Sequence, residues 1–198
     1  QTINIADIRR QVSQAIHGWL VRSASSATRT NYAADLNQFL DFLGTPPEAW
    51  EQLLTVRPTA VAAWRDWLTE NGLAKNSVRR KLTVLRSLFS YLQNCGFLGA
   101  NPAHSDFVDA PIVPRDGKTV GLTPADCRRL LDAPDPSLPL GIRDRALLAI
   151  LAYSACRVGE LTKLCLADYK SDGSHRVLEI QGKGGQQRRV ALHPEAVE

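Results

Sequence analysis

The sequence lacks the features of several common protein classes. It contains no methionine, and its longest apolar run, Ala146–Tyr153, has eight residues. Because a membrane-spanning helix needs about 20 apolar residues, we expect no such helix and no membrane partner. The N-terminus also lacks the basic and apolar segments of a secretory signal. The chain begins at Gln1, as a processed or trimmed protein would.

Metal-binding and disulfide patterns are missing as well. The four histidines show no spacing typical of metal ligands, and no two cysteines form a Cys-x-x-Cys pair. We therefore predict no metal site and expect buried, reduced thiols in a cytoplasmic protein. The four cysteines are Cys95, Cys127, Cys156 and Cys165.

Positive charge is concentrated in the first half of the 198-residue chain, whose formal net charge is +4. Residues 1–105 hold 11 Lys and Arg against 7 Asp and Glu, whereas residues 106–198 hold 13 of each kind. Since 44% of all residues are hydrophobic, the chain can also fill a core. The sequence thus predicts a basic module followed by a neutral one, and the basic module favours an anionic partner such as nucleic acid.

Apolar residues recur every three or four positions in the first half, which predicts a compact bundle of amphipathic helices. The four expected helices cover about residues 5–20, 28–43, 58–70 and 76–94. We place this helical domain at residues 1–105. The pattern then stops, and the prolines and glycines of residues 106–121 predict an interdomain linker.

Residues 122–198 combine helices with strands. Thr123 and Pro124 start a helix that ends near Asp132, and a strongly apolar helix over about 142–154 is expected at the centre of a core. A further helix runs from about Arg157 to Leu164. Alternating residues then predict two strands joined by a hairpin turn, at 176–180 and 187–192. The fold class is therefore mainly α with a small β-hairpin or sheet.

The fourth helix carries a row of cations and hydroxyl groups beside its apolar face. Lys75, Arg79 and Arg86 lie within about 40° of one another, and Thr83 continues the row. Cations there can neutralise DNA phosphates, although an ordinary solvated face shows the same pattern. Thr28, Arg29 and Thr30 begin the second helix, where hydroxyl groups serve either as caps or as phosphate contacts. The full set of DNA-binding candidates is Thr28, Arg29, Thr30, Lys75, Arg79, Arg80, Thr83 and Arg86.

Two further features are candidates for chemistry. Arg157 opens a helix, where its guanidinium group and the free helix N–H groups suit a phosphate, and Glu160 is placed to hold that guanidinium. A simple salt bridge at a helix junction is the structural alternative. Lys183 lies between glycines at the hairpin tip, where a lysine either delivers a proton to a substrate or only adds solubility.

Together these segments resemble the tyrosine recombinase (phage integrase) family, including the Xer-like recombinases. The first half matches its core-binding motifs in TRTNYAADLNQFL (28–40), KNSVRRKLTVLRSLF (75–89) and NPA (101–103). The second half matches its catalytic-domain motifs in LTPAD (122–126), RDRALL (143–148), SACRVGEL (154–161) and GKGGQQRRV (182–190). The order and spacing of these motifs carry the resemblance more than any one of them does.

The resemblance implies a helical, SAM-like core-binding domain followed by the first part of an α+β catalytic domain. It implies site-specific recombination of double-stranded DNA, through a 3′-phosphotyrosine intermediate, by a tetramer on two DNA sites. It also implies Arg157 as the first arginine that clamps the phosphate, Lys183 as the general acid and Glu160 as a supporting residue, without a metal ion or other cofactor.

The sequence departs from the family in two ways. Ala155-Cys156 stands where the family usually has Gly-Leu or a similar pair, and no His-x-x-Arg motif follows Lys183. All four tyrosines, Tyr32, Tyr91, Tyr153 and Tyr169, precede Lys183, whereas the family's nucleophile follows the lysine. We therefore expect this chain to be inactive alone. A noncatalytic DNA-binding regulator and a helical protein–protein adaptor remain as alternatives.

Overall fold

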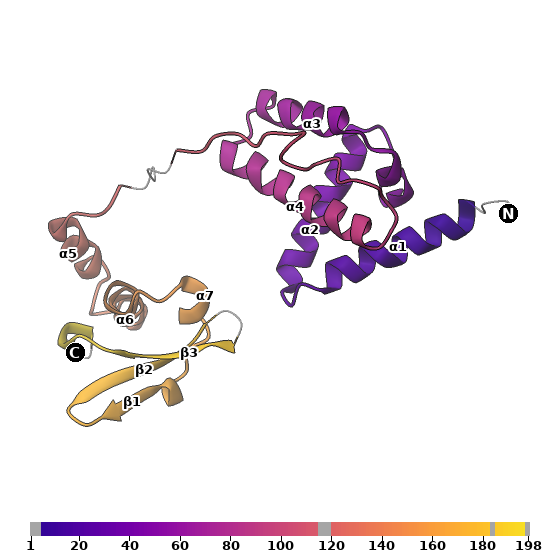
Figure 1. Cartoon of the computed structure of the whole chain (residues 1–198). Helices are drawn as coiled ribbons and strands as arrows, with labels where there is room; N and C mark the ends of the chain where they lie inside the picture. Colours follow the sequence, from indigo (N-terminus) through magenta and orange to yellow (C-terminus); the bar gives the residue numbers. More distant parts are fainter. Residues whose placement is uncertain (1–4, 115–119, 183–184, 197–198) are drawn as a thin grey trace. The chain divides into compact units, whose positions relative to one another are not determined.

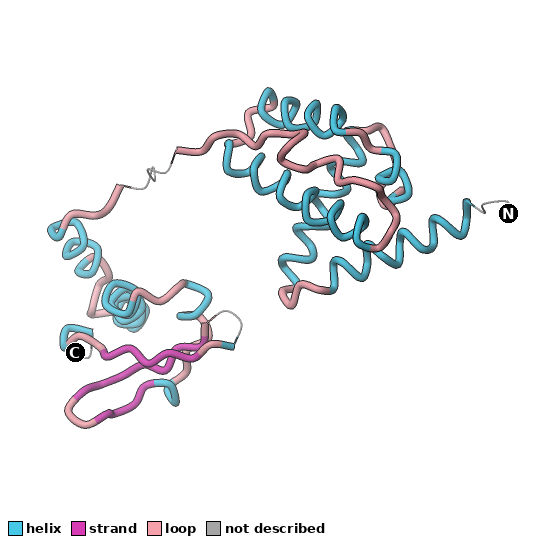
Figure 2. The backbone as a smooth tube through the Cα atoms, in the orientation of Figure 1, coloured by secondary structure: helices cyan, strands magenta, loops and turns pink. Residues whose placement is uncertain are grey.

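A computed structural model of the protein describes residues 5–114, 120–182 and 185–196. The chain divides into two compact units, residues 1–116 and 117–198 (Figure 1). Helices make up the first unit, and the second combines helices with an antiparallel sheet (Figure 2). The predicted fold class, mainly α with a small sheet, is therefore confirmed.

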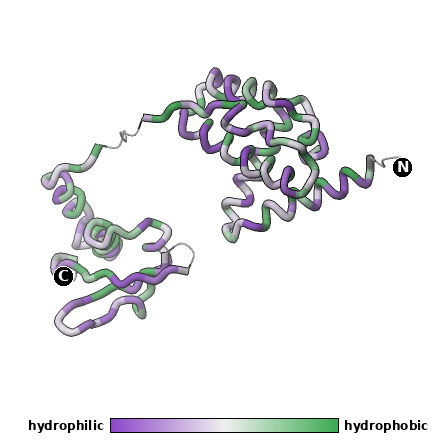
Figure 3. Tube along the Cα trace, in the orientation of Figure 1, coloured by the Kyte–Doolittle hydropathy of each residue, from purple (hydrophilic) through white to green (hydrophobic). Residues whose placement is uncertain are grey.

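The four helices predicted for the first unit are all present. Hydrophilic and hydrophobic residues are interspersed along each of them (Figure 3). A 3-10 helix that the apolar pattern did not predict lies between the second and third of them. The elements are α1 Ile5–Val21, α2 Ser26–Phe42, η1 Trp50–Thr55, α3 Pro58–Glu70 and α4 Lys75–Asn94. Gly44, Gly72 and Gly96 follow α2, α3 and α4 with positive φ, the usual way to end a helix.

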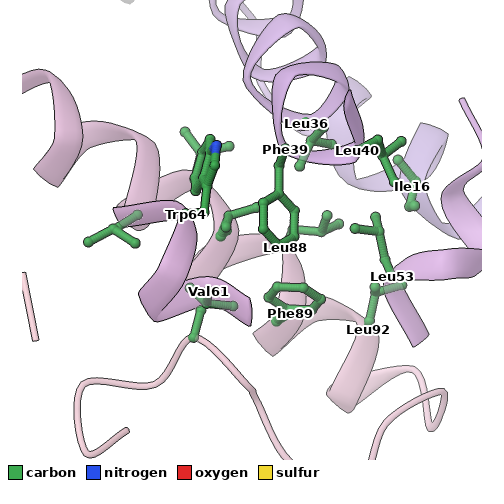
Figure 4. Packing of buried hydrophobic residues seen from close by; sticks show 14 of the residues in the cluster. Ile16, Leu36, Phe39, Leu40, Leu53, Val61, Trp64, Leu88, Phe89 and Leu92 are labelled. Carbon is green, nitrogen blue, oxygen red and sulfur yellow. The ribbon is translucent and has the colours of Figure 1, made fainter. Parts of the chain in front are cut away.

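Aromatic and aliphatic side chains from all these helices fill the core of the first unit (Figure 4). Phe39 of α2 packs on Trp64 of α3 with ring centroids 4.9 Å apart, and Leu88 and Phe89 of α4 are fully buried beside them. Full burial of each such side chain contributes about 1.5–3 kcal/mol. This core fixes the position of α4 and therefore the direction in which its exposed cations point.

The core of the first unit extends beyond its last helix. Val108 is only 1% exposed, and Ala110 packs against the same cluster. The apolar pattern predicts a first domain of residues 1–105 and a linker over 106–121, whereas the structure divides the chain after residue 116. The segment that follows α4 is therefore part of the folded unit up to at least Ala110.

The second unit contains the predicted helices and the predicted β-hairpin. Its elements are α5 Pro124–Asp132, α6 Pro139–Ser154, α7 Val158–Leu161, η2 Leu166–Asp168, β1 Tyr169–Asp172, β2 His175–Gln181, β3 Gln187–Ala191 and η4 Pro194–Ala196. The three strands form one antiparallel sheet in the order β1-β2-β3, and β1 was not predicted. Thr123 caps α5 as expected, because its hydroxyl accepts the Asp126 N–H.

One expectation for the second unit is wrong. The strongly apolar helix α6 is not enclosed on all sides within the described residues, because Leu140, Ile142 and Leu147 are 63%, 59% and 37% exposed. α6 contributes Ile150 and Leu151 to one side of the core, whose buried residues come from the α6–α7 junction, α7, β2 and the residue after β3. These residues are Cys156, Leu161, Leu178, Ile180 and Leu192.

The expectation of buried cysteines is also largely wrong. All four cysteines are free thiols, but only Cys156 is buried, and Cys95, Cys127 and Cys165 are exposed. Across the described ranges, no helix is both long and apolar enough to cross a membrane.

Candidate active site and DNA-binding surface

The candidate active site begins at the junction between α6 and α7. Ala155 has a φ of +50°, in the left-handed region, and this residue ends α6. The Ser154 hydroxyl accepts the Cys156 N–H at 3.2 Å and donates to the Ile150 carbonyl at 2.6 Å. The chain therefore turns sharply at Ala155, and Arg157 becomes the first residue of the next helical turn.

We expect Ala155→Gly to stabilise the second unit by about 1 kcal/mol, because glycine adopts a left-handed conformation without the penalty that a Cβ atom imposes. Urea denaturation of the chain, followed by circular dichroism, measures this change. Ala152→Gly in the exposed interior of α6 is the matched control and should destabilise by about 1 kcal/mol. If both substitutions destabilise, Ala155 is not strained.

Arg157 is held by a buried carboxylate. Glu160 is only 6% exposed, and its Oε2 accepts the Arg157 backbone N–H at 3.0 Å while its Oε1 accepts Arg157 Nη1 at 2.9 Å. The Arg157 side chain nevertheless stays 76% exposed. The predicted Arg157–Glu160 contact is therefore present, and it leaves the guanidinium group accessible to an anionic ligand.

A second arginine shares the same carboxylate. Arg188 of β3 donates from Nη2 to Glu160 Oε2 at 2.8 Å. Arg188 first, and then the Arg157 backbone N–H, hold the pKa of Glu160 at about 2, against the effect of burial. Glu160 is therefore ionised throughout the physiological pH range, and the cluster of Arg157, Glu160 and Arg188 has a net charge of +1.

Sequence reasoning missed Arg188, although a signal for it exists. Arg188 pairs with the fully buried Ile180 across the β2–β3 ladder, so it lies on the inward side of an alternating strand. An arginine at an inward position needs a carboxylate partner. That requirement, applied to the predicted hairpin, points to an acidic residue such as Glu160.

The helix N-terminus contributes less than we expected. α7 has only four residues, and Glu160 already accepts the Arg157 N–H at its start. The Arg157 N–H is therefore not free for a phosphate, whereas the exposed Arg157 guanidinium group is accessible to an anionic ligand.

Lys183 lies outside the described residues, so its position stays a prediction. The base of its turn is described, and there the Gly182 N–H donates to the Gln186 carbonyl at 2.7 Å. Tyr153 stacks on His193 with ring centroids 4.8 Å apart. Within residues 5–114, 120–182 and 185–196, no group of three or more His, Cys, Asp or Glu is arranged to hold a metal ion.

The candidate DNA-binding residues of α4 fall into two groups. Lys75, Arg79 and Thr83 are exposed along one face of the helix, as predicted. The Thr83 hydroxyl donates to the Arg79 carbonyl at 2.9 Å and can still accept a hydrogen bond. These side chains form an exposed row that suits contact with phosphates.

Arg80 binds a buried carboxylate on α2. Its guanidinium group contacts both oxygens of Asp35, at 2.5 and 3.0 Å, and Lys81 Nζ contacts Asp35 at 2.6 Å. Asp35 is 3% exposed, whereas the Arg80 side chain is 50% exposed. Asp35 thus ties α2 to α4 and fixes Arg80 with its outer edge accessible to solvent.

Arg86 has a role that the helical pattern did not predict. Its Nε donates to the Ala103 carbonyl at 2.9 Å, and its Nη2 donates to the Val108 carbonyl at 2.5 Å. Its side chain is therefore directed to the segment after α4 rather than to solvent. The expectation that Arg86 belongs to an exposed cation row is therefore wrong, because both of these donors are used within the first unit.

The candidates at the start of α2 are placed differently from one another. Ser25, not Thr28, caps the helix, because its hydroxyl accepts the Thr28 N–H. Arg29 Nη1 donates to the Ser23 carbonyl at 2.7 Å, and Thr30 is exposed. Thr30 is thus the most accessible of the three predicted contacts.

Each of the two units matches a model of a known protein family. Residues 16–96 match the family model "Phage integrase, N-terminal SAM-like domain", and residues 121–198 match the model "Phage integrase family". The chain belongs to the phage integrase family. Its tyrosine recombinase relatives include XerC of Thermodesulfovibrio yellowstonii, 32% identical over 92% of this chain, and XerD of Pseudomonas aeruginosa, 33% identical over 90%. This integrase-family chain spans 57% of the length of each relative.

Solved structures share the fold of this integrase-family chain. A lambda integrase dimer bound to a COC′ core site matches 98% of it with a TM-score of 0.67 and 18% identity, and this chain covers 51% of that protein. XerH recombinase bound to a palindromic difH substrate matches 75% with a TM-score of 0.54 and 20% identity, and 42% of that chain is covered. The predicted order, a SAM-like helical domain followed by the beginning of a catalytic domain, is confirmed.

Proposed function

We propose that this chain is part of a site-specific tyrosine recombinase, in which the first unit binds double-stranded DNA and the second supplies part of the active site. The observation that carries this proposal is the exposed Arg157 guanidinium group on a buried, ionised Glu160. This arrangement lies within the residues that match the phage integrase family. The relatives named tyrosine recombinase favour an enzyme over the noncatalytic regulator and the adaptor.

The proposed reaction is a transfer of a DNA phosphodiester to a tyrosine. A tyrosine oxygen attacks phosphorus, the bond from phosphorus to the 5′-oxygen breaks, and a 3′-phosphotyrosine link forms. Arg157 stabilises the negative charge that builds on the non-bridging oxygens, and Lys183 gives its proton to the leaving 5′-oxygen. The tyrosine would come from outside this chain, because all four of its tyrosines precede Lys183.

A nicked suicide DNA substrate tests the proposal, because the short strand released by cleavage diffuses away and traps the covalent complex. The full-length protein should form a protein–DNA adduct that survives denaturation. The 198-residue chain should form none. An adduct with this chain would show that one of its own tyrosines is the nucleophile, and none with the full-length protein would contradict the enzyme assignment.

For DNA binding, we propose contacts from Thr30 of α2 and from Lys75, Arg79, Arg80 and Thr83 of α4. The proposal is supported by the exposure of these side chains and by the ion pairs of Asp35, which hold α2 and α4 together. We also propose that the full-length protein acts as a tetramer on two DNA sites, as in the lambda integrase tetramer bound to a Holliday junction, whose fold this chain shares.

Arg79→Ala should weaken binding of duplex DNA, because it removes one exposed cation from the proposed phosphate contacts. The slope of log affinity against log salt concentration should fall in magnitude by about 1. Fluorescence anisotropy over a salt titration measures both effects.

Arg10→Ala on α1 is the matched control for this prediction. Arg10 is also exposed in the first unit and pairs only locally, with Asp7 three residues earlier. Its removal changes the net charge equally but should leave the salt slope unaltered. An equal loss of slope in both variants would mean that net charge, and not the α4 surface, governs binding.

A further inference from the structure

Arg188 is the second arginine of the candidate site, and it comes from a different element than Arg157. Its side chain is 38% exposed, half as much as that of Arg157, and it contacts Glu160 Oε2 from β3. Glu160 therefore joins α7 to the strand that follows the lysine turn. Two guanidinium groups and one carboxylate form a bridge between elements that are 28 residues apart in the chain.

The same bridge lies against the start of the lysine turn. A Cβ atom on Gly182 would lie 3.3 Å from the Gln186 carbonyl oxygen, 3.5 Å from Glu160 Oε1 and 3.8 Å from Arg188 Nη1. The backbone immediately before Lys183 thus packs against the carboxylate that holds Arg157. Any shift of Glu160 changes the surroundings of both Arg157 and the turn.

We propose that Arg188 is a positioning residue, which acts through Glu160 to orient the Arg157 guanidinium group. This inference rests on the proposed function for its catalytic consequence. Arg188 need not touch DNA itself. It holds a buried carboxylate in one place, so that the Arg157 guanidinium group keeps a fixed orientation during cleavage.

The electrostatics of the site explain why the second guanidinium group matters. A buried carboxylate is costly unless it is paired and hydrogen-bonded. The ionisable groups that face Glu160 in the described part of the site are Arg157 and Arg188, with the Cys156 thiol beside Arg188. Without Arg188, Glu160 keeps only its contacts to Arg157. Burial should then raise the pKa of Glu160, because fewer hydrogen bonds stabilise its charged form.

The first experiment measures the carboxylate directly. Arg188→Gln should raise the pKa of Glu160 from about 2 toward the ordinary value of 4.5, as read from its side-chain carboxyl ¹³C shift in an NMR titration. The matched control is Arg189→Gln on the opposite face of β3, since Arg189 pairs with Glu179 at 2.8 Å. That control should raise the pKa of Glu179 and leave Glu160 unchanged. An unchanged Glu160 pKa in Arg188→Gln overturns the proposal.

The second experiment measures cleavage by the full-length protein on the nicked substrate. Arg188→Gln should slow cleavage by up to about 100-fold at unchanged DNA affinity. The ratio of variant to wild-type rate should fall further as the pH is lowered to about 4, because protonation of Glu160 in the variant then releases Arg157. Arg188→Lys keeps one charged contact to Glu160, so it should cleave faster than Arg188→Gln. This variant also tests the proposal if Arg188→Gln does not fold stably.

These outcomes separate the two levels of the hypothesis. Cleavage by Arg188→Gln and Arg188→Lys at the wild-type rate and pH dependence overturns the positioning role, and the proposed function stands if Arg157→Ala is still impaired. If Arg157→Ala cleaves normally as well, the clamp role of Arg157 fails, and the proposed function itself fails if the wild-type full-length protein forms no adduct.

Discussion

Replacing Arg157 by alanine in the full-length protein should lower the rate of strand cleavage by about 10²–10³-fold, the usual effect of removing one donor that stabilises a transition-state anion. The guanidinium group is 76% exposed and fixed by Glu160, so its loss removes an oriented charge without opening the core. Single-turnover adduct formation on a nicked substrate measures this rate.

The controls for this prediction separate catalysis from binding. Arg129→Ala removes a comparably exposed arginine of α5 and should leave cleavage unchanged. Arg157→Lys keeps the charge but loses the planar pair of donors, so it should recover only part of the rate. DNA affinity should be similar in all three variants. Normal cleavage by Arg157→Ala would contradict the role of Arg157 in stabilising the transition state.

Replacing Lys183 by alanine should slow cleavage of ordinary DNA by about 10²–10⁴-fold, the range for general acid catalysis. An alkoxide leaving group needs a proton as the bond to phosphorus breaks. A thiolate does not, because a thiol has a pKa of about 8.5. A substrate with sulfur in place of the bridging 5′-oxygen should therefore be cleaved by Lys183→Ala at nearly the wild-type rate.

The substrate with sulfur in place of the 5′-oxygen tests whether Lys183 acts by transferring a proton. Lys170→Ala on β1 is the control, because Lys170 is an exposed lysine of the same unit that pairs with Glu179. It should cleave both substrates normally. If Lys183→Ala remains equally slow on the sulfur substrate, the lysine acts in another way, for example by holding the phosphate.

The helices and the hairpin were predictable because their periodic apolar residues pack on a core. β1 was not, since all four of its residues are exposed and its polar sequence shows no alternation. The exposure of α6 was not predictable either, because the sequence of an apolar helix shows the same pattern whether or not other elements cover the helix. Periodicity describes which way a residue faces and does not describe what covers it.

The candidate site was predictable in part for a similar reason. Spacing along one helical turn gave the contact between Arg157 and Glu160. Arg188 joins them from another element, and Arg86 reaches back to carbonyl groups after its own helix. Long flexible side chains can turn away from the face on which their Cβ atom lies, so a helical pattern alone does not reveal their partners.

The contacts of Arg86 also bear on how this family's modules can be exchanged. A hybrid protein that joined the first unit to another catalytic domain at residue 105 would lose Val108 from the core and one of the two carbonyls that Arg86 binds. A junction placed after Ala110 keeps both. The first unit is therefore best transferred as the helical bundle together with residues 95–110, which Arg86 binds at Ala103 and Val108.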